Sequence, residues 1–91
     1  MKVSSVKSFA KDLKKLPAFV LKRVFEIIKV LETTNSLEES NLDYKKMKGA
    51  ANDENYYRIR IGDYRIGIEL KHPDVILIRV LARGEIYKYF P

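Results

Sequence analysis

The sequence contains no cysteine, no tryptophan and one histidine among its 91 residues. The absence of cysteine excludes disulfide bonds and zinc sites built on thiolates, and it favours a cytoplasmic protein. No apolar run approaches the roughly 18 residues of a membrane-spanning helix, and no signal segment opens the chain. No linker or repeat divides the sequence. We therefore expect one domain over residues 1–91 that acts without a membrane.

Basic side chains outnumber acidic ones, with 18 Lys and Arg against 12 Asp and Glu and a formal net charge of +6. A surplus of this size favours a polyanion or an acidic protein as the partner. Basic proteins that bind no nucleic acid carry a similar surplus. Charge alone therefore does not choose between these partners.

The first third of the chain predicts one strand and two helices. Residues 1–6 are partly alternating and β-branched, which favours a first strand. Ser8 is the expected N-cap of a short amphipathic helix, and Pro17 opens a second helix that runs to about Thr33. The second helix has an apolar stripe at helical spacing: Val20, Val24, Ile27, Ile28 and Leu31. Two helices joined at a proline form an αα-hairpin that needs a surface to cover.

Residues 35–54 are polar and of mixed charge, and we expect a loop with a short strand near Tyr44–Lys48. The lysines at positions 45, 46 and 48 can neutralise phosphates. A lysine run is also typical of a solvated surface. Of these lysines, we place Lys48 among the candidate RNA-binding residues.

Residues 56–70 predict a β-hairpin, because side chains alternate at period 2 on both sides of Gly62 and Asp63. A two-residue turn there pairs Arg60 with Arg65 and Arg58 with Gly67. Directly paired residues share a face of the sheet, so three arginines gather beside a glycine. Like charges across strands repel, which points to an anionic ligand.

Residues 75–81 predict a further strand, rich in β-branched side chains. We expect Ile76, Ile78 and Val80 to face the helices. Leu77, Arg79 and Leu81 then lie on the arginine face, because the opposite register would bury an unpaired Arg79. Residues 84–91 are rich in aromatics, which can cover the sheet edge or stack on bases.

These elements predict an α+β fold, in which an N-terminal strand and an αα-hairpin pack on one face of a twisted antiparallel β-sheet. The other face is concave and basic, which suits RNA phosphates because arginine binds and stacks on them. An alternative is that the arginines pair with Asp63, Glu69 and Glu85, or with an acidic partner protein.

Three sequence features together resemble the RelE/ParE superfamily of toxins from type II toxin–antitoxin modules. They are Met47-Lys48-Gly49, the hairpin sequence Tyr57-Arg58-Ile59-Arg60-Ile61-Gly62-Asp63-Tyr64-Arg65-Ile66, and the closing Arg83-Gly84-Glu85-Ile86-Tyr87. The similarity spans essentially the whole chain. Members resembling RelE cleave mRNA in the ribosomal A site, and members resembling ParE poison DNA gyrase. The arginines and the terminal tyrosine favour the RelE branch.

The resemblance implies a role for several residues. Arg65 matches an arginine that binds the reacting phosphate, and Arg83 and Tyr87 match the closing catalytic motif. Arg58 and Arg60 match residues that hold the substrate backbone. We add Arg79 and Lys48 to the RNA-binding candidates. The implied reaction is attack of a ribose 2′-hydroxyl on the adjacent phosphate, without metal or other cofactor, which gives a 2′,3′-cyclic phosphate.

The proton acceptor for this reaction is the open question. Arginine holds its proton too strongly, whereas Tyr87 would give up its proton readily only beside positive charge. Glu85 is another candidate, and we do not expect His72 to take part because it lies in a distant turn. Many relatives have a histidine where this chain has Ala82. Without that histidine, this protein could be a slower, differently specific or inactive member of the superfamily.

The resemblance also implies partners. We expect an acidic, partly disordered antitoxin that binds the basic groove or the helix pair and forms a hetero-oligomer with the toxin. The ribosome and mRNA are the expected targets. The alternatives are a gyrase inhibitor of the same fold and a catalytically silent module that binds RNA or antitoxin.

Overall fold

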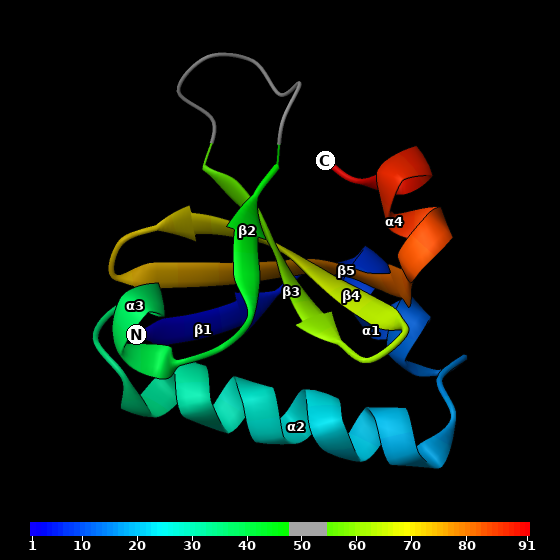
Figure 1. The fold of residues 1–91 in the computed structure, drawn as a ribbon, viewed down its shortest axis with the longest axis horizontal. Helices are drawn as coiled ribbons and strands as arrows, with labels where there is room; N and C mark the ends of the chain where they lie inside the picture. The colour runs from blue at the N-terminus through cyan, green and yellow to red at the C-terminus, as the bar shows by residue number, and fades with distance from the viewer. Residues whose placement is uncertain (48–54) are drawn as a thin grey trace.

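A mixed five-stranded sheet forms the centre of the computed structural model, which describes residues 1–47 and 55–91. The strands are β1 (Lys2–Ser5), β2 (Tyr44–Lys46), β3 (Tyr56–Ile61), β4 (Tyr64–Lys71) and β5 (Asp74–Ala82). Their spatial order is β1-β5-β4-β3-β2, antiparallel from β2 to β5, with β1 parallel to β5 (Figure 1). The predicted α+β fold is confirmed, and β1 adds one parallel pair to the antiparallel sheet.

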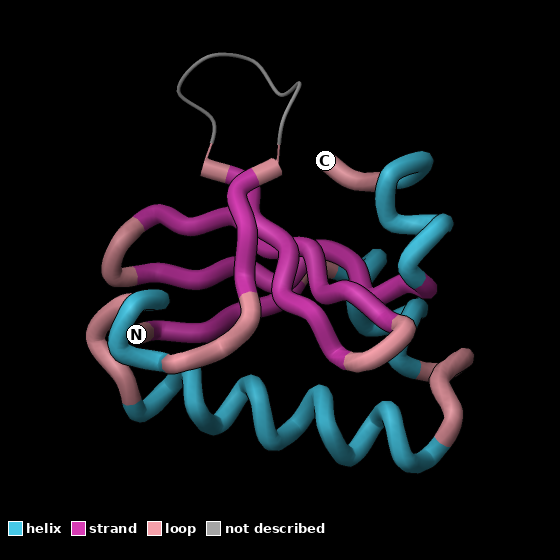
Figure 2. The backbone as a smooth tube through the Cα atoms, in the orientation of Figure 1, coloured by secondary structure: helices cyan, strands magenta, loops and turns pink. Residues whose placement is uncertain are grey.

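The helices in the described ranges are α1 (Lys7–Leu13), α2 (Ala18–Thr33), α3 (Leu37–Ser40) and α4 (Arg83–Tyr89). Figure 2 shows α2 and α4 on opposite sides of the strands. The predicted helix pair is confirmed, and Pro17 is the N-cap of α2. The sequence did not predict α3 or α4. None of the helices in these ranges is long and apolar enough to cross a lipid bilayer.

The main core lies between α2 and the sheet. Its fully buried side chains include Val24 and Leu31 from α2 and Ile59, Ile66 and Ile68 from the hairpin. The stripe predicted from helical spacing is the buried face of α2, with Ile28 partly buried at its border. Each such side chain contributes about 1.5–3 kcal/mol when it leaves water, so this core positions the hairpin on α2.

A second, smaller core lies under α4. Met47, Ile86 and Phe90 are buried there, against Ile78 and Leu81 of β5. The C-terminal aromatics were expected to cover the sheet edge or to stack on bases. Phe90 instead covers the sheet face opposite α2, because Ile86 and Phe90 lie on the inner side of α4 and its cap.

The predicted hairpin register is confirmed in every pair. Arg60 lies opposite Arg65, and Arg58 lies opposite Gly67. Gly62 occupies the first position of the turn with φ +54°, a conformation that glycine adopts without steric cost. The turn sequence alone therefore placed these arginines on a common face.

The predicted register of β5 is correct only beyond Ile78. Val80 lies opposite Ile66 on the α2 side, and Arg79 lies opposite Gly67 on the other face, as expected. Leu81 likewise lies opposite Arg65. This half of β5 therefore continues the arginine face across the sheet.

The prediction is wrong for Leu77, Ile76 and Ile78. The register shifts between Gly67 and Ile68, so that Leu77 lies opposite Ile68 and is buried under α2. Ile78 instead packs against the core under α4. A bulge inserts one residue and reverses the alternation on its far side, and the uniformly apolar sequence of residues 75–78 gave no sign of it.

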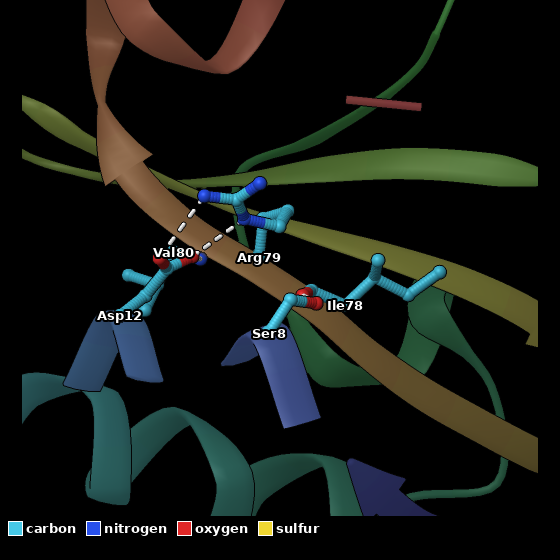
Figure 3. Close-up of polar contacts among 5 residues, drawn as sticks. All are labelled: Ser8, Asp12, Ile78, Arg79 and Val80. Atoms are coloured by element: carbon cyan, nitrogen blue, oxygen red, sulfur yellow. Dashed lines mark hydrogen bonds and ion pairs between the residues drawn. The ribbon is translucent and has the colours of Figure 1, made fainter. Parts of the chain in front are cut away.

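Helix α1 closes the edge of β5 beyond the end of β1. Ser8 Oγ donates to the carbonyl of Ile78 at 2.7 Å, and the buried Asp12 carboxylate accepts from the Val80 N–H at 3.0 Å (Figure 3). Arg79 also donates to Asp12 from Nε at 2.8 Å and Nη2 at 3.1 Å. The predicted N-cap role of Ser8 is wrong, because α1 begins at Lys7 and Ser8 serves the strand edge instead.

Gly67 provides a test of how α4 is seated. A Cβ atom added at Gly67 would lie 2.7 Å from the Phe90 ring, whereas one added at Gly84 would meet nothing within 4 Å. We expect Gly67→Ala to lower the free energy of unfolding by about 1–3 kcal/mol, because the ring must move. The matched control, Gly84→Ala, should be neutral or stabilising by about 0.5–1 kcal/mol, since it lies in a helix. Urea denaturation measures both, and equal values would contradict this packing.

Candidate functional site

A basic pocket lies on the sheet face opposite α2. Its volume is about 140 Å³, and its lining residues are Asp43, Lys45, Arg58, Arg60 and Arg65. We call this set the arginine pocket. Two cross-strand pairs build it, because Lys45 lies opposite Arg58 and Arg60 lies opposite Arg65. The structure thus brings together the three arginines that the hairpin pattern grouped.

Arg65 is the most enclosed cation of the arginine pocket, with only 9% of the residue exposed. Its Nη1 donates to the carbonyl of Gly62 at 2.8 Å and to that of Tyr64 at 2.9 Å. Both bonds are local to the hairpin turn, so they hold the guanidinium without neutralising its charge. A fixed, poorly solvated cation is a suitable group to bind an anion.

Neighbouring charges also act on Arg65. Burial lowers the pKa of its guanidinium, and the positive charge of Arg60 lowers it further. Tyr87 opposes this shift, and Arg83 and Arg58 add smaller lowering effects. A phosphate bound here would relieve the repulsion among these cations, because opposite charge favours the protonated form.

Tyr87 borders the arginine pocket from α4. The Arg58 guanidinium carbon lies 5.4 Å from the centre of the Tyr87 ring, within cation–π range. A second hollow of about 380 Å³ is lined by Lys45, Lys46, Met47, Arg58 and Tyr87. Lys45 and Arg58 line both hollows, so the two are adjacent, and we call them together the groove. Tyr87 is 57% exposed, so its ring is open to a ligand.

Arg83 is placed near Arg65 by the start of α4. Its backbone N–H donates to the Asp63 carbonyl at 2.8 Å, which ties the helix to the hairpin turn. The Arg83 side chain is exposed. Arg83 and Tyr87 are four residues apart in one helix, so both lie on the same side of α4. The helix therefore accounts for the spacing of the closing motif.

Arg79 lies apart from the arginine pocket, although it shares the same face of the sheet. Its guanidinium is held by Asp12 and lies 5.6 Å from the Tyr89 ring centre. The bond to Asp12 raises the pKa of Arg79 despite partial burial. Its role in RNA binding stays a prediction. Lys48 lies outside the described residues, as does the glycine that follows it in the resemblance.

Two other candidates for proton transfer lie away from the groove. Glu85 lines a separate depression with Asp12 and Arg79, and its carboxylate is 3.8 Å from Lys88 Nζ. His72 Nε2 is 2.9 Å from the Asn35 carbonyl oxygen, in the turn between β4 and β5. That turn is at the other end of β4 from Arg65. Among these candidates, only Tyr87 borders the groove.

Two residues of the arginine pocket, Asp43 and Lys45, were not among the predicted site residues, although Lys45 belongs to the lysine run that was considered for phosphate binding. Lys45 enters the pocket because β2 pairs with β3, and Asp43 enters because its carboxylate is 3.9 Å from Arg60 Nη1. Both side chains of that ion pair are more than half exposed, so it contributes little to stability. One signal was available for Lys45: Tyr44 packs against the core, and alternation then turns its neighbour to the opposite face.

The sequence has relatives over nearly its whole length. Residues 5–87 match the family described as ParE toxin of type II toxin-antitoxin system, parDE. A curated protein of Methanocaldococcus jannaschii, Toxin RelE3, is 50% identical over 91 residues, which cover 100% of both chains. These matches extend over the hairpin, the arginine pocket and α4.

Solved structures resemble the fold as well. A chain of a RelB-RelE antitoxin-toxin complex from Methanococcus jannaschii matches with a TM-score of 0.78 and 48% identity, covering 96% of this chain and 98% of that chain. A chain of an archaeal RelE-RelB complex from Pyrococcus horikoshii OT3 matches with a TM-score of 0.71 and 29% identity, covering 91% and 94%. Sequence and fold therefore both point to relatives named as RelE.

Proposed function

The chain belongs to the RelE/ParE superfamily of toxins from type II toxin–antitoxin systems, and we propose that it is a ribosome-dependent endoribonuclease that cleaves mRNA and inhibits translation. The observation that carries this proposal is the arginine pocket, with its enclosed Arg65 and the exposed Tyr87 ring beside it. Fixed positive charge next to an aromatic ring suits an RNA phosphate and its base.

The proposed reaction transfers a phosphate ester within the RNA chain. The 2′-oxygen of ribose loses its proton and attacks the adjacent phosphorus, and the bond from phosphorus to the 5′-oxygen breaks as that oxygen takes up a proton from an acid or from water. The products are a 2′,3′-cyclic phosphate and a 5′-hydroxyl. Arg65 and Arg60 would stabilise the negative charge that grows on the phosphorane, since groups placed in advance for developing charge cost no reorganisation. Arg58 and Lys45 would hold the backbone.

Tyr87 is the group that we assign to the attacking hydroxyl, because its phenol borders the groove and is exposed. We expect Tyr87→Phe to lower single-turnover cleavage by about 10²-fold or more, the usual scale of general base catalysis. Binding to ribosomes should fall much less, because the ring and its contact with Arg58 remain. Equal losses in cleavage and binding would show that Tyr87 positions the substrate instead of moving a proton.

The partner that would control this activity is an antitoxin protein. The solved relatives are RelB-RelE complexes, and a groove lined by so many cations would attract an acidic chain. We expect an antitoxin to cover the arginine pocket or the helix pair. Copurification with the protein encoded by the neighbouring gene tests this expectation.

A gyrase inhibitor is the second candidate function, favoured by the match of residues 5–87 to a ParE family. Inducible expression followed by mapping of mRNA 5′ ends distinguishes the two, with purified gyrase assayed in parallel. New 5′ ends within translated codons would support mRNA cleavage. Inhibited supercoiling without such ends would support gyrase inhibition. The absence of both effects would indicate a catalytically silent member of the family.

A further inference from the structure

The net charge of this protein is confined to its first 25 residues. Residues 1–25 contain seven Lys and Arg and one Asp, which leaves +6, the formal charge of the whole chain. Residues 26–91 contain eleven basic and eleven acidic residues and are neutral overall. The arginine pocket therefore lies in the balanced part of the sequence, and the surplus belongs to a different surface.

Three of the seven basic residues in this segment lie on helix α1 and its C-cap. Lys7 and Lys11 of α1 and Lys14 at its C-cap are exposed and recur at positions i, i+4 and i+7, so they lie in one row along the helix. We call this row the lysine face. Phe9 and Asp12 point the other way and are buried against the sheet. The row spans about 10 Å, at 1.5 Å per residue.

The lysine face has no internal charge partner. The one acidic residue of α1, Asp12, is committed to Arg79 and the Val80 N–H. Within residues 1–47 and 55–91, none of the three lysines forms an ion pair. Like charges at i, i+4 repel by about 0.2–0.5 kcal/mol per pair, and Lys7 opposes the helix dipole, whereas the dipole favours Lys11 in the last turn and Lys14 at the C-cap. The row therefore presents uncompensated positive charge to solvent, which an external anion can neutralise.

The side chains of the lysine face favour nucleic acid over protein. Protein interfaces are centred on aromatic and other large apolar side chains and are poor in lysine. The one aromatic residue of α1, Phe9, is buried. The exposed Phe19 and Phe25 belong to α2. A protein partner would find its apolar anchors there and not on the lysine face.

The same composition favours a duplex over a single strand. Single strands are bound by aromatic rings on which bases stack, and the groove at Tyr87 offers such a ring, whereas the lysine face does not. A nucleic-acid duplex carries one phosphate per nucleotide on both strands, so a row of about 10 Å faces several phosphates. Lysines contact phosphates as point charges without reading a sequence.

We propose that the lysine face of α1 binds the phosphate backbone of double-stranded ribosomal RNA, independently of sequence. This inference rests on the proposed function, because a toxin that cleaves mRNA on the ribosome needs a second contact to hold it there. The arginine pocket binds the single-stranded substrate, and the lysine face anchors the protein to the surrounding RNA. Each surface has the side-chain chemistry that its target requires.

The test measures binding of the purified full-length protein to an RNA hairpin with a stem of about 16 base pairs, a length that a small RNA-binding domain spans. Fluorescence anisotropy at several salt concentrations gives the affinity and its salt dependence. We expect the K7Q/K11Q/K14Q variant to bind at least about tenfold more weakly at 0.1 M salt, because each phosphate contact contributes to the salt-dependent affinity. The slope of log K against log salt should become shallower by about 2–3.

The matched control is K29Q/K71Q/K88Q, which removes the same charge from exposed lysines of α2, the end of β4 and α4. It should change hairpin affinity by less than about threefold, since bulk charge acts only through screened, long-range attraction. Equal losses in the two variants would overturn the proposal. So would unchanged binding by the α1 variant. Thermal unfolding should show that the stability of the α1 variant changes by less than about 1 kcal/mol, because the lost repulsion among the lysines and the lost dipole contacts of Lys11 and Lys14 offset each other.

Two further binding measurements distinguish RNA from DNA and from a protein partner. Tighter binding to a DNA duplex of the same length than to the RNA hairpin would overturn the assignment to RNA. A K7Q/K11Q/K14Q variant that binds the hairpin normally but loses an acidic antitoxin would assign the face to a protein. Cleavage is not read in this assay. Failure of the endoribonuclease proposal would appear as absent mRNA 5′ ends with the unmodified protein, whereas failure here appears in hairpin binding.

Discussion

Replacement of Arg65 by alanine is expected to abolish growth inhibition and to lower mRNA cleavage by about 10²–10³-fold, the usual effect of removing one group that stabilises transition-state charge. Arg65 is the most buried cation of the arginine pocket and is fixed by two carbonyls of the hairpin turn. Alanine removes the charge from the centre of the pocket. Primer extension on a translated reporter mRNA measures the loss, and a fully toxic Arg65→Ala protein would refute the assignment.

The controls for Arg65 separate chemistry from folding. Arg65→Ala also leaves two turn carbonyls without their donor, which costs about 1 kcal/mol. Arg65→Lys keeps the charge but loses the planar fork, so we expect a partial recovery of cleavage with similar stability. Lys71→Ala removes an exposed charge outside the pocket and should retain full toxicity. Melting temperatures of all three variants show whether the inactive one is folded.

Replacement of Asp12 by alanine is expected to have the largest effect on stability, a loss of about 3 kcal/mol. The Asp12 carboxylate is 5% exposed and accepts from two nitrogens of Arg79 and from the Val80 N–H. Its removal leaves a partly buried guanidinium and a buried N–H without their acceptor (Figure 3). In a domain of this size, Tm should fall by roughly 15 °C. Calorimetry measures both the Tm and the enthalpy.

A double variant tests the origin of that loss. Arg79→Leu removes the cation together with its need for a partner. The Asp12→Ala/Arg79→Leu protein should therefore be more stable than the sum of the two single losses predicts. Asp74→Ala, at an exposed position at the start of β5, is the matched control and should change stability by less than about 0.5 kcal/mol. Additive losses in the double variant would show that the two side chains act independently.

The elements that sequence reasoning predicted well are the local ones. The β3–β4 hairpin is determined by alternation and by a glycine that can adopt positive φ, both of which are properties of neighbouring residues. Its register followed directly, and with it the grouping of Arg58, Arg60 and Arg65. The buried stripe of α2 was predicted for the same reason, because the period of the side chains is visible in the sequence.

The errors arose where distant segments decide the structure. The tail was not recognised as a helix, although α4 brings Arg83 and Tyr87 to one side of the groove. The short segment is stabilised by burial of Ile86 and Phe90 over Gly67, a contact that no local pattern contains. Helices of this length are marginal in isolation, so tertiary packing and not propensity selects the helix.

The candidate site shows the same division. Arg79 was assigned to the arginine face, and the alternation of β5 does place it there. Its side chain is nonetheless held by Asp12, 67 residues earlier in the chain. Lys45 was not chosen as a site residue, yet it belongs to the arginine pocket because the short strand expected near it, β2, pairs with β3.

The sequence by itself determined the hairpin, its arginine cluster, the buried face of α2 and the resemblance to the superfamily, because each depends on residues close together in the chain. Tertiary structure alone decided the bulge in β5, the seating of α4 and the capture of Arg79 by Asp12. Those features depend on which surfaces meet after the chain has folded. Their free energies come from burial and from hydrogen bonds between distant residues, which periodicity and propensity do not record.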